Sequence, residues 1–437
     1  MRTAVVLFTR DLRVHDNLAL STAAHEAERI VPLFVFDDAI LGSAFARPNR
    51  VAFLLDALRD LDASLTSRGA RLVVRSGDVI AETLALARDV RAGAVFVAED
   101  ASAYAQRRQR RFAHVCRSDR IALCGTPGVT VAPLLSIKTS SGEHYSVFTP
   151  FYRSWSSASR RPVETAPRRL SIPTGVSRGR LPTLTHLVAG SPSPELPPGG
   201  ETAGRRKLAT WLDSDVAGYD PGRDDLAADA TSRLSPYLHF GCISPLEVAQ
   251  RAADVAGTTT FVRQLAWRDF FHQLLAARPE TAHEDMRPRG DQWRSESEAL
   301  EAWKNGKTGY PIVDAGMRQL LREGYMHNRA RLITASFLVH DLRLDWRAGA
   351  RHFFDWLVDG DVANNVGNWQ WVAGTGANPR RGRALNPLRQ AHRFDPDGTY
   401  VRRYVPELAA IEGSAVHEPW KLRENATGYP TPIVDRP

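Results

Sequence analysis

Short apolar runs alternate with amphipathic stretches over the N-terminal part of the chain. Five runs have the length and the β-branched or aromatic content of buried strands, at residues 4–8, 30–36, 71–74, 94–98 and 121–124. The stretches between them carry apolar residues at helical spacing. Strand and helix in alternation predict a parallel sheet covered by helices on both faces, a Rossmann-like α/β fold.

The pattern changes in the second half. Residues 171–204 are rich in Pro, Gly and Ser, which is typical of a linker. Beyond them the apolar residues keep a helical period, and nine of the ten tryptophans lie there. The sequence therefore predicts an α/β domain at 1–130, an interdomain linker at 131–204 and an all-α domain at 205–437.

Composition narrows the class of protein. The chain has 437 residues, a formal net charge of +8 and a pI near 9.6, which permits a polyanionic partner. Three cysteines without CxxC spacing argue against a disulfide framework or a zinc site, so we expect a reduced, cytoplasmic protein and no metal. The N-terminal apolar run is too short for a signal peptide or a membrane span.

The segment "DATSRLSPYLHFG" (229–241) gathers hydroxyl groups at a predicted helix start. Ser235 before Pro236 is a good N-cap, with Pro236 as the first helical residue. Thr231, Ser232 and Ser235, with Arg233 beside them, are suited to bind phosphate through side chains and free backbone N–H groups. An ordinary capped helix would have the same sequence.

The segment "QLAWRDFF" (264–271) places Gln264, Trp267, Arg268 and Phe271 on one helical face. An amide, an indole and a guanidinium in a row can stack on, and hydrogen-bond to, a planar heterocycle. An amphipathic helix with its tryptophan in the core is the more common explanation of such a pattern.

The segment "DGDVANNVGNWQW" (359–371) combines carboxylates, amides and indoles. Asp359, Asp361 and Asn365 can accept and donate hydrogen bonds around a polar ring. Trp369 and Trp371 lie two apart, which puts them on widely separated faces of a helix. We therefore expect one indole to line a pocket and the other to point into the domain.

These segments carry a strong resemblance when they are read together. The sequence "LFTRDLRVHDNLAL" and then "TSRLSPYL", "WRDFF", "GKTGYPIVDAGMRQL", "MHNRARLITASFL", "DGDVANNVGNWQW" and "NPLRQAHRFDPDGTYVRRYVPEL" follow in order from residue 4 to about 430. The chain resembles the photolyase/cryptochrome family, and by pattern its cyclobutane pyrimidine dimer photolyases of bacterial type. The resemblance implies FAD, UV-damaged DNA as partner, and a monomer that makes no membrane contact.

The activity that the resemblance implies is light-driven repair, by electron transfer from excited reduced FAD to a flipped-out pyrimidine dimer. Asn365 would face flavin N5, Asp361 would accept from the ribityl edge, and Asp359 would pair with Arg331 beside the ring. The implied FAD-binding set is Tyr219, Thr231, Ser232, Arg233, Leu234, Ser235, Arg331, Asp359, Gly360, Asp361 and Asn365.

The resemblance also assigns the indoles. Trp369, Trp346 and Trp293 would form an electron-transfer chain and count, with Asn365, as the catalytic residues. The implied DNA- and substrate-binding set is Gln264, Trp267, Arg268, Asn328, Arg329, Trp371, Arg383 and Gln390.

Some positions depart from the family's common pattern. Many relatives have glutamate in place of Gln264 and methionine in place of Leu332, and an aromatic pair where this chain has Arg381-Gly382. The (6-4) photolyases need histidine where Asn328 and Leu332 stand, so we expect repair of cyclobutane dimers and not of (6-4) products. A cryptochrome-type blue-light photoreceptor without repair is the alternative, which the short chain end after "PIVDRP" disfavours.

A second chromophore is expected in the α/β domain. Phe36 and Asp38 follow the second predicted strand and Asp100 follows the fourth, so they lie at carboxyl ends of strands, where parallel sheets bind ligands. Relatives with a deazaflavin antenna have an aspartate that matches Asp100, whereas a folate antenna favours Asn-Glu where this chain has Tyr104-Ala105. The resemblance thus favours 8-hydroxy-5-deazaflavin over folate.

Overall fold

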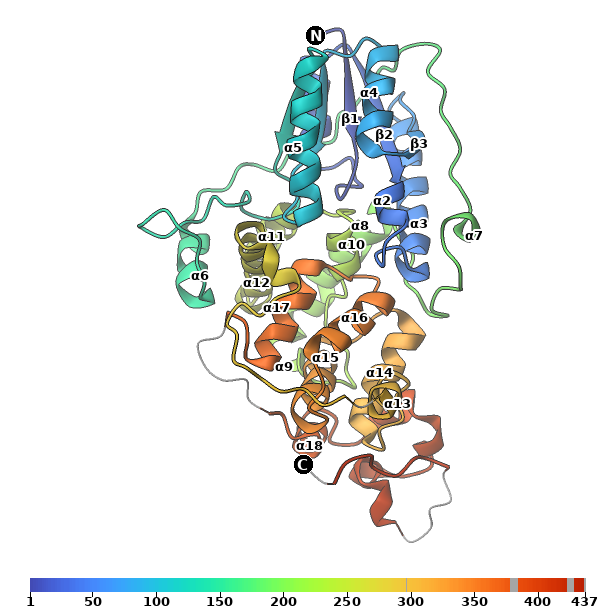
Figure 1. The fold of residues 1–437 in the computed structure, drawn as a ribbon, viewed down its shortest axis with the longest axis vertical. Coiled ribbons are helices and arrows are strands. Elements are labelled where there is room, and N and C mark those ends of the chain that lie inside the picture. The colour runs from blue at the N-terminus through green and yellow to red at the C-terminus, as the bar shows by residue number, and fades with distance from the viewer. Residues whose placement is uncertain (296, 378–383, 423–427, 436–437) are drawn as a thin grey trace. The chain divides into compact units, whose positions relative to one another are not determined.

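The computed structural model describes residues 1–295, 297–377, 384–422 and 428–435. Its contacts divide the chain into two compact units that interleave along the sequence (Figure 1). Unit 1 comprises Met1–Ser191, Pro197–Val216 and Ser232–Glu280, and unit 2 comprises Pro192–Leu196, Ala217–Thr231 and Thr281–Pro437. The domain boundaries expected at 130 and 204 stay a prediction.

A five-stranded parallel sheet forms the core of unit 1, as the apolar runs predict. Its strand order is β3-β2-β1-β4-β5, and Val5 of the central strand pairs with Val31 on one side and Val95 on the other. The strands are β1 Thr3–Leu7, β2 Arg29–Asp37, β3 Val73–Gly77, β4 Ala94–Ala98 and β5 Ala122–Thr126.

Helices cover both faces of this sheet, which explains why the inner strands β1, β2 and β4 read as continuous apolar runs. Helices α4 (Val79–Asp89) and α5 (Ala103–Ser118) share one hydrophobic cluster with the strands, through Leu84 and Phe112. Helix α1 (Leu18–Glu26) packs against β1 and β4 with buried residues outside that cluster, so it covers the opposite face.

Unit 1 also contains helices that lie outside the sheet. Asp269 of α12 (Thr259–Ala277) is buried and accepts hydrogen bonds from the backbone N–H groups of Val131 and Ala132, at 3.1 and 2.9 Å, and from Trp155 Nε1 of α6 at 2.9 Å. Burial raises the pKa of Asp269 more than these bonds lower it. The others are α2 Asp38–Leu41, α3 Pro48–Thr66, α6 Phe148–Ser157, α7 Leu184–Leu187, α8 Glu201–Thr210, α10 Ser235–His239 and α11 Pro245–Ala253.

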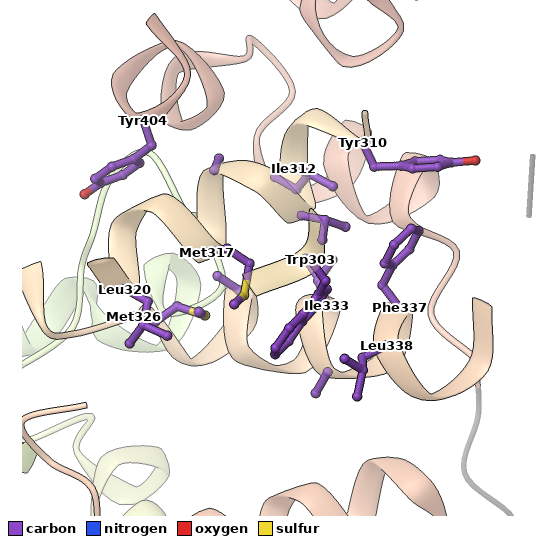
Figure 2. Packing of buried hydrophobic residues seen from close by; sticks show 14 of the residues in the cluster. Trp303, Tyr310, Ile312, Met317, Leu320, Met326, Ile333, Phe337, Leu338 and Tyr404 are labelled. Atoms are coloured by element: carbon purple, nitrogen blue, oxygen red, sulfur yellow. The ribbon is translucent and has the colours of Figure 1, made fainter. Parts of the chain in front are cut away.

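The regular elements of unit 2 are all helices over its described residues, as predicted. Trp303, Ile333 and Phe337 are among the side chains that fill its core (Figure 2). A Cβ on Gly316 would lie 2.8 Å from Thr334 Cγ2, so glycine lets two of the helices approach closely. The helices are α9 Tyr219–Gly222, α13 Ser297–Lys304, α14 Pro311–Glu323, α15 Asn328–Ser336, α16 Trp346–Trp356, α17 Val362–Ala373, α18 Pro387–Phe394 and α19 Thr399–Tyr404.

The predicted cap at Ser235 is wrong. Ser235 is the first residue of α10, and Leu234 stands at the cap position without a side-chain hydrogen bond. Arg233 has a left-handed backbone, with φ of 49°, so the chain has already turned into helical geometry at Leu234. The Ser244-Pro245 pair does behave as a cap, because Ser244 Oγ accepts from the N–H of Glu247 at 3.2 Å.

Three observations bear on the class of protein. No helix within the described part of the chain is long and apolar enough to cross a membrane. Over the same residues, no group of three His, Cys, Asp or Glu side chains could hold a metal ion. Cys116, Cys124 and Cys242 are all free thiols.

Candidate functional site

An ion pair joins α15 to the turn before α17 in unit 2. Arg331 Nη2 lies 2.8 and 3.1 Å from the two carboxylate oxygens of Asp359, and Arg331 Nε donates to the carbonyl of Met326 at 2.8 Å. The Asp359 side chain is only 4% exposed. The predicted pair is therefore confirmed, and loss of Arg331 would leave a buried carboxylate without its cation.

The start of α17 is fixed by short polar contacts. Asp361 is the N-cap, and its Oδ1 accepts from the backbone N–H and the side-chain Nδ2 of Asn364, at 2.9 and 2.8 Å. Asn365 Nδ2 donates to the carbonyl of Ala350 at 2.9 Å, which ties α17 to α16. Gly360 closes the preceding turn by donating to Leu357. The described residues supply no partner for Asn365 Oδ1, which is thus available to a ligand.

The two indoles of α17 have opposite environments, as their spacing predicts. Trp369 is 2% exposed and Trp371 is 38% exposed. Trp369 makes edge contacts with Phe353 and Trp303, with ring centroids 5.0 and 6.1 Å apart. Its Nε1 is buried and has no hydrogen-bond partner within the described residues. A Cβ on Gly349 would collide with this ring at 2.2 Å.

The other two indoles of the expected chain belong to the same core. Trp346 is fully buried, and its Nε1 donates to Asp285 Oδ1 at 2.9 Å. The Arg347 guanidinium covers the Trp346 ring at 4.7 Å and also binds Asp285. Trp293 is half-buried and packs against this core from outside. The contact between Trp303 and Trp369 was not foreseen, because no local motif singles out Trp303.

The start of α15 separates a buried histidine from an exposed asparagine. His327 is the N-cap, and its Nδ1 accepts from the N–H of Arg329 at 3.1 Å. Its side chain is buried, whereas Asn328 is exposed. Arg329 pairs with Asp224 at 2.8 Å and lies over the Phe394 ring. His327 thus points away from the surface that Asn328 occupies.

Other expected ligands of DNA or cofactor have separate environments. Tyr219 begins α9, and burial raises the pKa of its phenol to about 12, so it stays neutral. Thr231 is half-buried and its N–H donates to Asp229. Gln390 is half-buried on α18. Arg383, Arg381 and Gly382 lie outside the described residues.

The remaining expected phosphate ligands belong to unit 1. Ser232 and Arg233 are half-buried, and Ser232 Oγ accepts from the N–H of Leu234 at 3.4 Å. Leu234 is buried, and Ser235 opens the five-residue α10. Their contact with a phosphate stays a prediction.

On α12 in unit 1, two of the expected substrate-binding side chains contact other parts of the unit, and a third is exposed. Trp267 stacks on Phe148 of α6, with ring centroids 3.6 Å apart and planes 6° apart. Arg268 donates to the carbonyls of Val129 and Leu238, at 2.6 and 3.2 Å. Gln264 is exposed. Arg268 thus holds backbone within unit 1, and its contact with DNA stays a prediction.

The carboxyl edge of the sheet carries the residues expected for a second ligand. Asp100 binds Arg10 Nη1 through both oxygens, at 3.1 and 3.3 Å. Phe36 is buried within β2 against Phe34, and Asp38 is exposed at the start of α2. The binding of a second chromophore by these three residues stays a prediction.

Further polar residues lie at this edge that the sequence analysis did not predict as ligand-binding. Asp37 accepts from the Tyr104 hydroxyl and from the N–H of Ala39. Burial lowers the pKa of Arg108, against the opposing charges of Asp100, Asp37 and Asp11. Asp100 and Asp11 follow β4 and β1, Asp37 is the last residue of β2, and the strand order reverses between β1 and β4. Their position after apolar runs was the available signal.

The fold and these sites define a two-part protein, with a Rossmann-like α/β region and a helical region built around an ion pair and clustered indoles. Residues 4–168 match the family model described as DNA photolyase, and residues 261–437 match that of the FAD binding domain of DNA photolyase. The chain is 50% identical over 442 residues to the deoxyribodipyrimidine photo-lyase of Streptomyces griseus, covering 100% of this chain and 97% of that relative. The chain belongs to the DNA photolyase family.

Solved structures agree with this assignment. A bacterial class III photolyase from Agrobacterium tumefaciens superposes with a TM-score of 0.93 at 34% identity, over 100% of this chain and 95% of that one. A cryptochrome from Synechocystis gives a TM-score of 0.91 at 29% identity, over 100% and 97% of the two chains. The fold is therefore common to a photolyase and to a cryptochrome.

Proposed function

We propose that the protein uses light to repair cyclobutane pyrimidine dimers in DNA, with FAD as its redox cofactor. The observation that carries the proposal is the arrangement on α15–α17, where the Arg331–Asp359 pair and Asn365 belong to the same helical unit as buried Trp369. The relative from Streptomyces griseus, which is 50% identical and is named a deoxyribodipyrimidine photo-lyase, supports the same reaction.

The donor set of unit 2 fits an isoalloxazine. A ring of this kind presents N–H donors and carbonyl and ring-nitrogen acceptors. The guanidinium of Arg331, the carboxylates of Asp359 and Asp361 and the free amide oxygen of Asn365 answer both kinds of group. FAD, when bound in its reduced form and excited by light, supplies the electron that splits the dimer. Tyr219, Thr231, Ser232, Arg233, Leu234, Ser235 and Gly360 complete the proposed FAD-binding set.

The buried indoles have a separate proposed role. Trp293, at the edge of the core, would pass an electron inward through Trp346 to Trp369, and an external reductant would replace the electron that Trp293 has lost. The Asp285 carboxylate lies 2.9 Å from Trp346 Nε1, so it stabilises positive charge on that indole while the electron passes. The chain thereby restores the reduced state of the cofactor and takes no part in splitting the dimer.

Substrate recognition falls to exposed and half-covered groups. Trp267 and Trp371 each offer a ring face to a flipped-out base, and such stacking contributes about 1–3 kcal/mol per base. Gln264 and Asn328 donate amide hydrogens to pyrimidine carbonyls. Arg268, Arg329, Arg383 and Gln390 are proposed to contact the DNA backbone.

The lesion follows from the same side chains. Repair of a (6-4) product moves a hydroxyl between bases and calls for a general acid. Asn328 cannot act as one, and the neighbouring His327 is buried with its Nδ1 capping α15. Cyclobutane dimers are therefore the proposed substrate.

An antenna chromophore is proposed at the carboxyl edge of the sheet, bound by Asp100, Phe36 and Asp38, and 8-hydroxy-5-deazaflavin is preferred over folate. Added deazaflavin should then extend the action spectrum of repair towards its own absorption band. An unchanged spectrum would remove this proposal. We further propose that the protein acts as a cytoplasmic monomer.

The decisive experiment uses the purified, chemically reduced holoprotein. It is illuminated with an oligonucleotide that carries one cyclobutane thymine dimer, and in parallel with one that carries a (6-4) product. We expect light-dependent loss of the cyclobutane dimer alone, and weaker binding of it by Asn328→Ala. An intact dimer after illumination of flavin-loaded protein would contradict repair and favour a photoreceptor.

A further inference from the structure

Unit 1 contains a pocket of about 680 Å³ that none of the sites above includes. The segment 163–168 forms one wall, and the others come from His15, Arg68 at the end of α3, Arg205 of α8 and Glu247 of α11. We call it the arch pocket, after the segment that spans it. Its volume lies in the range of pockets that bind small molecules, about 300–1,000 Å³.

The arch is fastened at its first end by a buried carboxylate. Asp16 accepts from Arg161 Nη1 and Nη2 at 2.5 and 3.0 Å and from the N–H of Glu164 at 2.9 Å, and its own N–H donates to the Glu164 carbonyl. Burial raises the pKa of Asp16, but its bonds with Arg161 and Ser244 lower it further, so the carboxylate stays charged.

The second end is fastened to the residues after α3. The N–H of Leu170 donates to the carbonyl of Arg68 at 2.7 Å, and Leu170 is buried. Gly69 has φ of +92°, and a Cβ there would lie 2.8 Å from the Leu170 carbonyl oxygen, so a glycine is needed for this contact. Because both ends are anchored, the pocket is a preformed part of unit 1.

Its charges favour an anion. Arg205 is neutralised by Glu247, whose Oε2 lies 2.7 Å from Arg205 Nη1. Neither Arg68 nor Arg168 forms an ion pair within the described part of the chain, and Arg168 is exposed on the arch. Glu164 adds one carboxylate, which leaves the pocket with a net positive charge. Two guanidinium groups on one pocket are the donor set that phosphate prefers.

His15 adds a group of different character. Its Nδ1 lies 2.7 Å from Oε1 of Glu201, and the same buried carboxylate accepts from the N–H groups of Val14 and His15. Because the carboxylate binds Nδ1, Nε2 is the ring nitrogen left to hydrogen-bond a ligand hydroxyl. Phosphate donors and a partner for a hydroxyl in one pocket match a sugar phosphate.

We propose that the arch pocket binds a small phosphorylated ligand with free hydroxyl groups, of the size of a nucleoside monophosphate. The phosphate would lie against Arg68 and Arg168, and a sugar hydroxyl against His15. The site is independent of the proposed repair reaction, because it shares no residue with it.

Calorimetric titration of the FAD-loaded full-length protein tests this proposal with AMP, ribose 5-phosphate and adenosine as probes. We expect both phosphates to bind and adenosine to fail. Arg168→Gln should weaken AMP binding about tenfold or more, since it removes a charge-assisted contact. This side chain is exposed and forms no hydrogen bond or ion pair among the described residues, so the variant should fold. Arg71→Gln is the matched control, an exposed arginine outside the pocket.

The outcomes separate clearly. Failure of both phosphates to bind at millimolar concentration overturns the proposal, and so does equal binding of AMP and adenosine. AMP binding that Arg168→Gln leaves unchanged places the ligand elsewhere and also overturns it. Dimer repair by Arg168→Gln should equal that of the unmodified protein, so the result does not depend on whether the repair function is correct.

Discussion

Trp369 of α17 in unit 2 and Trp267 of α12 in unit 1 carry the same indole ring in opposite environments. Trp369 is enclosed by Phe353, Trp303 and the backbone of Gly349. Trp267 has one face covered by Phe148 and remains half-buried. Both stand in aromatic-rich helical sequence, so the local pattern does not distinguish them, and only their tertiary neighbours do.

The difference teaches what each indole can do. An enclosed ring is held in one orientation and screened from water, which suits passage of an electron between fixed partners. A ring that is only half-buried keeps exposed area for contact with another planar group, and stacking tolerates any base.

The largest effect is expected from Trp293→Phe. Photoreduction of oxidised flavin, followed by absorbance with an external reductant, should fall to a small fraction of the unmodified rate, because the electron loses its entry point at the edge of the core. Repair by chemically reduced protein should be unchanged. Trp420→Phe is the control, since Trp420 packs against the same core but lies outside the proposed chain. If Trp293→Phe photoreduced the flavin as fast as the unmodified protein, the three indoles would have only a packing role.

Trp267→Ala should weaken binding of dimer-containing DNA by about 1–3 kcal/mol, the value of one stacked base. Fluorescence anisotropy with matched damaged and undamaged oligonucleotides measures the loss, which should fall mainly on the damaged strand. Phe148→Leu removes the ring behind Trp267 and should cost less. Unchanged affinity in Trp267→Ala would mean that this indole serves the fold alone.

Gly349→Ala should destabilise unit 2 by about 1–3 kcal/mol, because its methyl group would overlap the Trp369 ring in a packed core. Urea unfolding followed by tryptophan fluorescence measures the change. Gly218→Ala is the matched control in the same unit, since a Cβ there meets no atom within 4 Å. Equal stability of the two variants would show that the enclosure of Trp369 is loose.

The smallest effect concerns Asp341, the last residue of the short helical segment Phe337–Asp341. Burial raises the pKa of Asp341 to about 6, and its Oδ2 has no partner within the described residues. The native state therefore holds the proton more tightly than the unfolded chain, and stability falls as pH rises from about 4 through 6. Asp341→Asn should gain about 1–2 kcal/mol over the unmodified protein at pH 7.5. At pH 4 the gain should vanish, and a gain independent of pH would exclude this titration.

The centre of the sheet could be predicted because β1, β2 and β4 are buried on both faces and are therefore almost continuously apolar. The run at 94–98 coincides with β4, whereas β3 begins at Val73 and not at 71, because the shorter run gave no clear boundary. The cap at Ser235 was mispredicted since no glycine marks the left-handed turn at Arg233.

The candidate site was predictable as far as motifs extend. The pairing of Arg331 with Asp359 followed from family resemblance. The contacts of Trp267 and Arg268 did not, because their partners Phe148 and Val129 lie more than a hundred residues away. The arch pocket could not be predicted for the same reason, because Asp16 and Arg161, which fasten the arch, are separated by 145 positions.

The buried Asp269 has a consequence for the kinetics of hydrogen exchange. Val131 and Ala132 lie in neither a helix nor a strand, and such backbone amides ordinarily exchange with solvent within the lifetime of small fluctuations. Here both amides are bound to a carboxylate of α12, with Gln273 holding Leu135 and Pro133 beyond them. They can exchange only when this stretch detaches from α12. In a deuterium-labelling experiment the amides of Val131 and Ala132 should thus exchange as slowly as the backbone amides of α12, although their own segment is irregular.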